Sequence, residues 1–79
     1  MFKLAILDIQ TASSIFQELV SMVVLPGEEG EFSILDFHQP IISCLKKGLI
    51  KIDNRPPMAI KGGIAKMKND ELVVLVEKE

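Results

Sequence analysis

Three side chains near the middle of the sequence could support nucleophilic catalysis. The chain holds one cysteine, Cys44, and one histidine, His38, with Asp36 two residues before the histidine. A thiol becomes a strong nucleophile when a neighbouring base removes its proton. Asp36 and His38 fall in an expected loop and Cys44 in an expected strand, so contact between the imidazole and the thiol is geometrically feasible. No pattern supplies an oxyanion hole or a substrate pocket, so catalysis by a small hydrolase is a weak hypothesis.

Metal and phosphate chemistry have even less support. A metal cage built on one cysteine and one histidine would need two carboxylates from elsewhere in the chain, so we expect neither a metal site nor a cofactor. Cys44 is instead expected to be a small buried apolar residue, and His38 a loop residue used for packing or contact. Gly62-Gly63 lacks the Gly-Lys-Ser/Thr that follows in a phosphate-binding loop, and is expected to mark a bulge or a close approach of two backbones.

Two lysines offer a modification site. Lys66-Met67-Lys68 stands immediately before Asn69-Asp70 and has some likeness to the hairpin lysine of small domains that carry biotin or lipoate. Those domains place a single lysine at the tip of the hairpin, between two methionines in the biotin case, whereas here one methionine lies between two lysines. A carrier or adaptor β-domain is therefore the alternative hypothesis, and both lysines are better interpreted as charges at the mouth of a hairpin.

Length and composition predict one small domain over residues 1–79. The chain has 79 residues, of which 48% are hydrophobic, enough to bury a modest core. Its apolar runs are far shorter than the ~20 residues of a membrane span, and the first residues do not resemble a secretory signal. A lone cysteine suits a reducing compartment.

Charge is distributed unevenly along the sequence. Residues 1–40 carry one lysine and six carboxylates, whereas residues 41–79 carry eight basic and five acidic side chains. The basic residues are scattered, the isoelectric point is about 5.3, and tyrosine and tryptophan are absent. We therefore expect no nucleic-acid partner.

The elements that must position these groups are strands. Apolar segments alternate with turn signals at intervals of about 8 to 12 residues, which is typical of a β-sandwich or barrel. The sequence predicts strands at residues 2–8, 20–25, 31–35, 41–45, 48–52, 58–67 and 71–76. Asn69-Asp70 is expected to form a tight hairpin turn, since both residues tolerate a left-handed backbone. The first strand is apolar on both faces, which indicates a surface that a partner covers.

One segment allows two interpretations. Residues 13–20 could begin a helix, because Ser14 with Gln17 could form a capping box and four apolar residues would share one helical face. The β-branched residues that follow favour a strand, since one or two helical turns gain little without a longer apolar stripe.

The most specific pattern runs from Leu25 to Gly48. It contains Pro26-Gly27, Gly30-Glu31, Ile34-Leu35, His38 and Pro40 at fixed spacings, and is followed by Gly62-Gly63 and Val73-Val74-Leu75. Phe16 and Leu19-Val20 precede it. With these motifs the chain resembles, over essentially its whole length, the N-terminal domain of the epsilon subunit of F-type ATP synthases, called delta in mitochondria.

Four positions depart from the family pattern. Ser33 and Phe37 stand where the family has glycine, Gln39 replaces a small residue, and Lys47 replaces a proline. A bulky residue disfavours the positive φ that glycine adopts, so we expect the loop at Asp36-Phe37 to differ most from relatives.

The resemblance implies a flattened β-sandwich of about ten short strands. It also implies a non-catalytic rotor subunit in the central stalk of the proton-translocating ATP synthase, coupling the gamma subunit to the c-ring. The C-terminal helical hairpin of the family is absent from these 79 residues, so neither inhibition of ATP hydrolysis nor ATP binding is expected of them. No cofactor is implied.

The resemblance further assigns contacts and a location. The turn Glu29-Gly30-Glu31 is expected to meet the polar loops of the c-ring. The gamma subunit is expected to contact His38, Gln39, Pro40, Ile41 and Ile42. The chain would then lie at the cytoplasmic face of the bacterial inner membrane, or the equivalent organelle face, and touch the membrane only through the complex.

Overall fold

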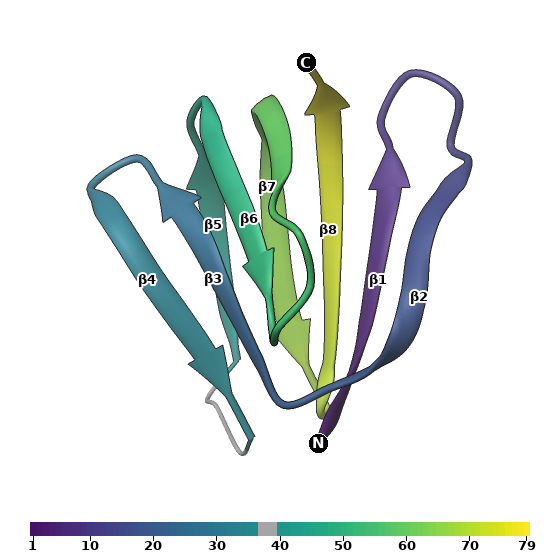
Figure 1. The fold of residues 1–79 in the computed structure, drawn as a ribbon, viewed down its shortest axis with the longest axis vertical. Coiled ribbons are helices and arrows are strands. Elements are labelled where there is room, and N and C mark those ends of the chain that lie inside the picture. Colours follow the sequence, from purple (N-terminus) through teal and green to yellow (C-terminus); the bar gives the residue numbers. More distant parts are fainter. Residues whose placement is uncertain (37–39) are drawn as a thin grey trace.

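The computed structural model describes residues 1–36 and 40–79, which form strands joined by turns (Figure 1). Eight strands follow one another along the chain: β1 (Phe2–Asp8), β2 (Ser14–Val20), β3 (Met22–Gly27), β4 (Gly30–Leu35), β5 (Ile41–Leu45), β6 (Gly48–Ile52), β7 (Met58–Lys68) and β8 (Glu71–Lys78). The all-β class is confirmed. The described residues form eight strands where about ten were expected, and the long β7 serves both layers as one strand. None of the described residues forms a helix with the length and apolar character of a membrane span.

The strands make two layers that share β7. The first layer has the order β2-β1-β8-β7-β5, with only the β1–β8 pair parallel. The second layer has the order β7-β6-β3-β4, in which every pair is antiparallel. Residues 58–60 of β7 pair with β6, whereas residues 63–67 pair with β5. Figure 1 shows the result, with β3 and β6 in front of β5.

The core fills the space between the layers with apolar side chains only. Alternate residues of each strand point inward, as the period of two requires. The buried residues are Phe2, Leu4, Ile6, Val20, Val23, Leu25, Ile34, Leu45, Ile50, Ile52, Ile60, Ala65, Met67, Leu72, Val74 and Val76. Among the described residues no polar or charged side chain is buried. The core therefore supplies stability and offers no buried group for chemistry.

Residues 14–20 form a strand, which confirms the favoured interpretation. β2 lies antiparallel to β1, and Phe16 stands opposite Ile6 while Val20 stands opposite Phe2. Pairing with β1 satisfies the backbone of this short segment, and an isolated helical turn could not compete with that gain.

The predicted turn chemistry is also confirmed. Asn69 and Asp70 join β7 to β8 with φ angles of 51° and 63°, the left-handed values that a two-residue hairpin requires. At the glycine pair, the β7–β8 register shifts between Ile60 and Gly62. A Cβ atom on Gly63 would lie 2.3 Å from the carbonyl oxygen of Leu75. Both predicted roles, bulge and close approach, are present together.

The predicted burial of Cys44 is wrong. β5 carries apolar residues on both of its faces, so its sequence alone does not say which face is inside. Pairing with β7 sets Leu45 into the core, and alternation then places Ile42 and Cys44 outward. Cys44 is an exposed free thiol.

The loop after β6 fastens the two layers at one end of the molecule. The Asp53 carboxylate accepts hydrogen bonds from the backbone N–H groups of Ser21, at 3.1 and 3.2 Å, and Met22, at 2.9 Å. The Arg55 guanidinium lies 2.5 Å from Glu18 Oε1 and 5.1 Å from the centre of the Phe16 ring. The loop between β6 and β7 is thus tied to β2 and to the β2–β3 junction.

Asp53→Ala is expected to lower the free energy of unfolding by about 1–2 kcal/mol, because two backbone donors lose a charged acceptor. Asp53 also has a φ of 43°, which alanine tolerates less well than aspartate or asparagine. Asp53→Asn should lower the free energy of unfolding less, since asparagine keeps one side-chain oxygen that accepts a hydrogen bond and also tolerates a positive φ. Urea unfolding midpoints measure both variants, and an unchanged midpoint for Asp53→Ala would contradict this role.

Candidate interaction surfaces

The outer side of the first layer carries a largely apolar surface, which we name the apolar face. Its members are Ala5, Leu7, Ile42, Cys44, Ile64, Val73 and Leu75. Strand register aligns them into two rows, because residues paired across neighbouring strands lie side by side on one surface. Ile42 is 74% exposed and Ile64 is 42% exposed. An apolar surface of this extent on a small domain indicates a partner.

The outer side of the second layer is less uniform. Exposed Met22 and Leu35 stand opposite each other on β3 and β4, whereas exposed Leu49 lies on β6, beyond Lys51. Lys51 Nζ forms an ion pair with Glu31 Oε2, 3.6 Å away. The apolar face is therefore the stronger candidate for a large docking surface.

The turns at one end of the molecule form a charged surface. Glu28 and Glu29 connect β3 to β4, and Lys46 and Lys47 connect β5 to β6, at the same end as the C-terminal residue (Figure 1). The Lys46 N–H donates to the Pro26 carbonyl at 2.9 Å, and the Glu28 N–H donates to the Cys44 carbonyl at 3.2 Å. Two hydrogen bonds therefore hold these turns together as one unit.

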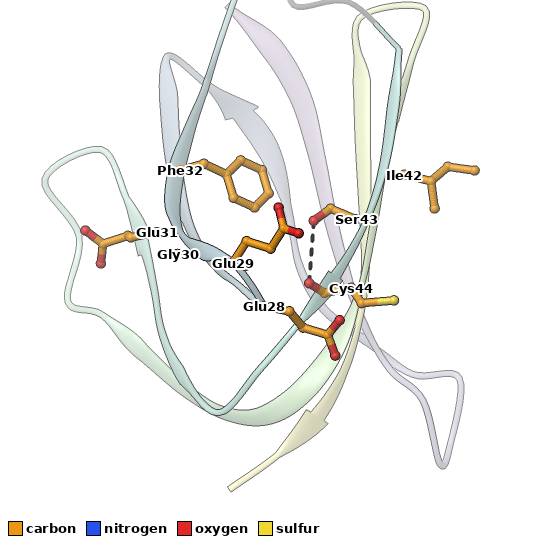
Figure 2. Close-up of a pocket in the computed structure, with 9 residues that line it drawn as sticks. Glu28, Glu29, Gly30, Glu31, Phe32, Ile42, Ser43 and Cys44 are labelled. Atoms are coloured by element: carbon orange, nitrogen blue, oxygen red, sulfur yellow. Dashed lines mark hydrogen bonds between the residues drawn. The ribbon is translucent and has the colours of Figure 1, made fainter.

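A hollow of about 480 Å³ lies between the β3–β4 turn and β5. Figure 2 shows Glu29 pointing toward Ser43, whereas Glu31 points away from the hollow. The side chains of Ile42 and Cys44 point outward, onto the apolar face. Glu29 and Glu31, the two expected ring-contact carboxylates, are both among the residues that line the hollow, and the Glu31 carboxylate pairs with Lys51.

Of the residues expected to contact gamma, Pro40, Ile41 and Ile42 are described, and all three line one hollow beside Lys66 and the β7–β8 turn. Ile42 lies on the apolar face, Ile41 packs against the core, and Pro40 is exposed just before β5. His38 and Gln39 lie outside the described residues, as does Phe37, where the largest departure from relatives was expected. The described members of this set therefore border the hairpin end of the apolar face, and Ile42 lies on it.

The described candidate catalytic and carrier groups lie on different parts of the fold, and His38 is outside the described residues. Cys44 lies on the apolar face, and the Asp36 carboxylate binds the amino group of Met1 at 2.5 Å. Lys66 and Lys68 lie within β7, before the hairpin tip formed by Asn69 and Asp70. Over the two described ranges no three His, Cys, Asp or Glu side chains gather as they would around a metal ion. What the geometry offers is surface for binding.

Comparison with known proteins identifies the fold family. Residues 2–78 match the family described as "ATP synthase, Delta/Epsilon chain, beta-sandwich domain". The chain belongs to this family. The resemblance inferred from the sequence motifs is thereby confirmed.

Two bacterial epsilon chains illustrate how this chain matches its relatives. The chain is 40% identical over 81 residues to the ATP synthase epsilon chain of Campylobacter curvus, an alignment that covers 98% of this chain and 63% of the relative. It is 36% identical over 75 residues to the epsilon chain of Desulforamulus reducens, covering 90% of this chain and 57% of the relative. The chain thus spans about three fifths of the length of these relatives.

Two solved structures share the fold of this epsilon-family domain. One is a chain of the central stalk and c-ring structure of the Tetrahymena thermophila mitochondrial ATP synthase, with a TM-score of 0.78, 13% identity, and coverage of 96% of this chain and 63% of that chain. The other belongs to the Euglena gracilis mitochondrial ATP synthase, with a TM-score of 0.79, 20% identity, and coverage of 92% and 48%. At sequence identities of 13% and 20%, the likeness to these two structures establishes the fold of this chain.

Sequence reasoning missed most of the apolar face. Ile64, Val73 and Leu75 were not among the predicted site residues. The available signal was that β8, like β1, is apolar on both faces. Two adjacent strands with that pattern predict a sheet that is covered on both sides.

Proposed function

We propose that the chain is a non-catalytic part of the rotor of the proton-translocating F-type ATP synthase, where it couples the gamma subunit to the c-ring. The observation that carries the proposal is the family match across residues 2–78. The surface supports it, because the outer side of the first layer carries an apolar face suited to contact with another protein. Mechanical coupling needs stiff contacts at two places and no bond chemistry.

The apolar face is the proposed docking site for gamma. A contact that transmits torque must be large and apolar at its centre, well above about 1,000 Å² in total buried area. The first layer presents such a centre on four neighbouring strands. The segment formed by residues 38–42, including His38, Gln39, Pro40 and Ile41, is proposed to extend the contact at the edge of the sheet, with Ile42 as its exposed anchor.

The turn Glu29-Gly30-Glu31 is the proposed contact with the polar loops of the c-ring. The hydrogen bonds from Glu28 and Lys46 fasten this turn to the β5–β6 turn, which supplies the stiffness that coupling requires. The carboxylates would orient the contact and raise its association rate more than its affinity.

The proposed location follows from these partners. The chain would be a peripheral component at the cytoplasmic face of the bacterial inner membrane, or the equivalent organelle face. It would reach the membrane only through gamma, the c-ring and the other subunits, without a cofactor or nucleic acid.

Binding to purified gamma tests the proposal directly. Mixing the two proteins should yield a complex that elutes earlier than either component on gel filtration. Separate elution at concentrations of tens of micromolar would contradict the proposed function.

Glu31→Lys is expected to weaken binding of the c-ring complex by about tenfold at low salt, because a like charge would then face the basic or polar groups that meet this turn. The fold should survive, since the Lys51–Glu31 pair is exposed on both sides and contributes at most about 1 kcal/mol. Glu71→Lys, at the opposite end of the first layer, is the matched control. If the c-ring complex pulls down Glu31→Lys and the wild-type chain in equal amounts, this contact is contradicted.

A further inference from the structure

One cation interrupts the apolar face. Lys66 stands in register with Val73 of β8 on one side and Ile42 of β5 on the other, and Ala5 follows beyond Val73. Lys66 therefore stands in the middle of a row of otherwise apolar residues. The sequence predicted Lys66 at the mouth of a hairpin. Strand register also places it within the surface proposed to bind gamma.

Within the described part of the chain, Lys66 has no ion-pair partner. The four ion pairs there involve the Met1 amino group, Lys47, Lys51 and Arg55. The nearest carboxylate along the rows is that of Glu71, which stands in register with both Lys3 and Lys68. Glu71 lines a hollow with Lys66 and Lys68, but among the described residues no ion pair joins it to either lysine, and the residues directly opposite Lys66 are apolar.

A hollow of about 460 Å³ adjoins Lys66 at the hairpin end of the apolar face. Ile42, Met67 and Asn69 line it together with Lys66 and Lys68. It offers room for a partner side chain that approaches with an apolar stem and a polar tip.

We propose that the gamma surface covering the apolar face carries a carboxylate that pairs with Lys66, so that Lys66 determines which gamma subunit this chain accepts. The inference rests on the proposed function and names the chemistry of the partner. An ammonium enclosed in an apolar interface is costly unless a carboxylate meets it. A gamma surface without an acidic residue at this position would leave the charge unpaired, and the mismatch itself would exclude non-cognate partners.

A lysine can also avoid burial by extending its stem and leaving its ammonium in water at the rim of the interface. The two arrangements differ in their response to a neutral side chain. If Lys66 meets a carboxylate, Lys66→Met leaves that carboxylate unpaired and weakens binding. If the ammonium reaches water, Lys66→Met adds apolar contact and leaves binding unchanged or tighter.

The experiment measures the dissociation constant of purified gamma for three variants of the whole chain. Lys66→Met is expected to weaken binding about 30-fold, and Lys66→Glu more than that, because truncating one partner of a buried charge pair carries a large loss. Lys61→Glu is the matched control, an exposed lysine of the same strand beyond the bulge, and should bind within about threefold of wild type. Urea unfolding midpoints check that each variant remains folded.

A charge exchange completes the test. A carbodiimide cross-link between Lys66 and a carboxylate first identifies the acidic residue on gamma, and a gamma variant with lysine at that position should restore binding of Lys66→Glu by at least tenfold. Binding of Lys66→Met as tight as wild type, or of Lys66→Glu no weaker than Lys61→Glu, would overturn the proposal and leave the gamma contact standing. A wild-type chain that does not bind gamma would overturn the proposed function and this proposal with it.

Discussion

Ile42→Asp is expected to weaken binding of gamma by about 100-fold or more. Ile42 is the most exposed member of the apolar face, and an aspartate there would bring an unpaired charge into the centre of an apolar contact. The fold should be unaffected, because the side chain is 74% exposed and contributes little to the core. Isothermal titration of the variant against purified gamma measures the loss.

Leu49→Asp is the matched control for this variant. Leu49 lies on the outer side of the second layer and is 43% exposed, so the same chemical change is made on the opposite surface. It should bind gamma like the wild type. The reverse pattern, in which Leu49→Asp loses binding and Ile42→Asp keeps it, would show that gamma docks on the second layer.

The second large effect is on stability. Gly63→Ala is expected to lower the free energy of unfolding by about 3 kcal/mol, because its Cβ would meet the Leu75 carbonyl and neither backbone can move without breaking the β7–β8 ladder. For a domain of 79 residues this is a large share of the total, which is about 4–12 kcal/mol.

Gly62→Ala provides the contrast for Gly63. Its Cβ would lie 3.4 Å from the Leu45 carbonyl, an ordinary contact, so the loss should stay below about 1 kcal/mol. Chemical denaturation of both variants measures the difference. Equal losses at the two positions would show that backbone conformation, and not the close approach to Leu75, governs the glycine pair.

The strands were largely predictable from the sequence because each has a local signature. Alternation identified β4, proline and glycine marked the end of β3, and Asn69-Asp70 fixed the last hairpin. β2 was harder, since seven residues fit a short helix as well as a strand. Pairing with β1 makes this segment a strand, and nothing within residues 14–20 indicates that pairing.

The surfaces were less predictable, because they depend on register between strands that are distant in the sequence. β5 is apolar on both faces, so only its pairing with β7 reveals that Leu45 is buried and Cys44 exposed. The same pairing brings Ile42 beside Lys66, a neighbourhood that neither segment predicts alone. The turn proposed to meet the c-ring, Glu29-Gly30-Glu31, is contiguous in the sequence, so naming it required no knowledge of register.

The central claim is that this chain works as a rotor component. The most direct test is to tag the chain in its native cell, isolate it from membranes under mild detergent, and identify the co-purified proteins by mass spectrometry with cross-linking. The account predicts an intact ATP synthase in stoichiometric amount, with cross-links from β5 and β7 to gamma. Isolation of the chain free of gamma and of the c-ring would contradict it.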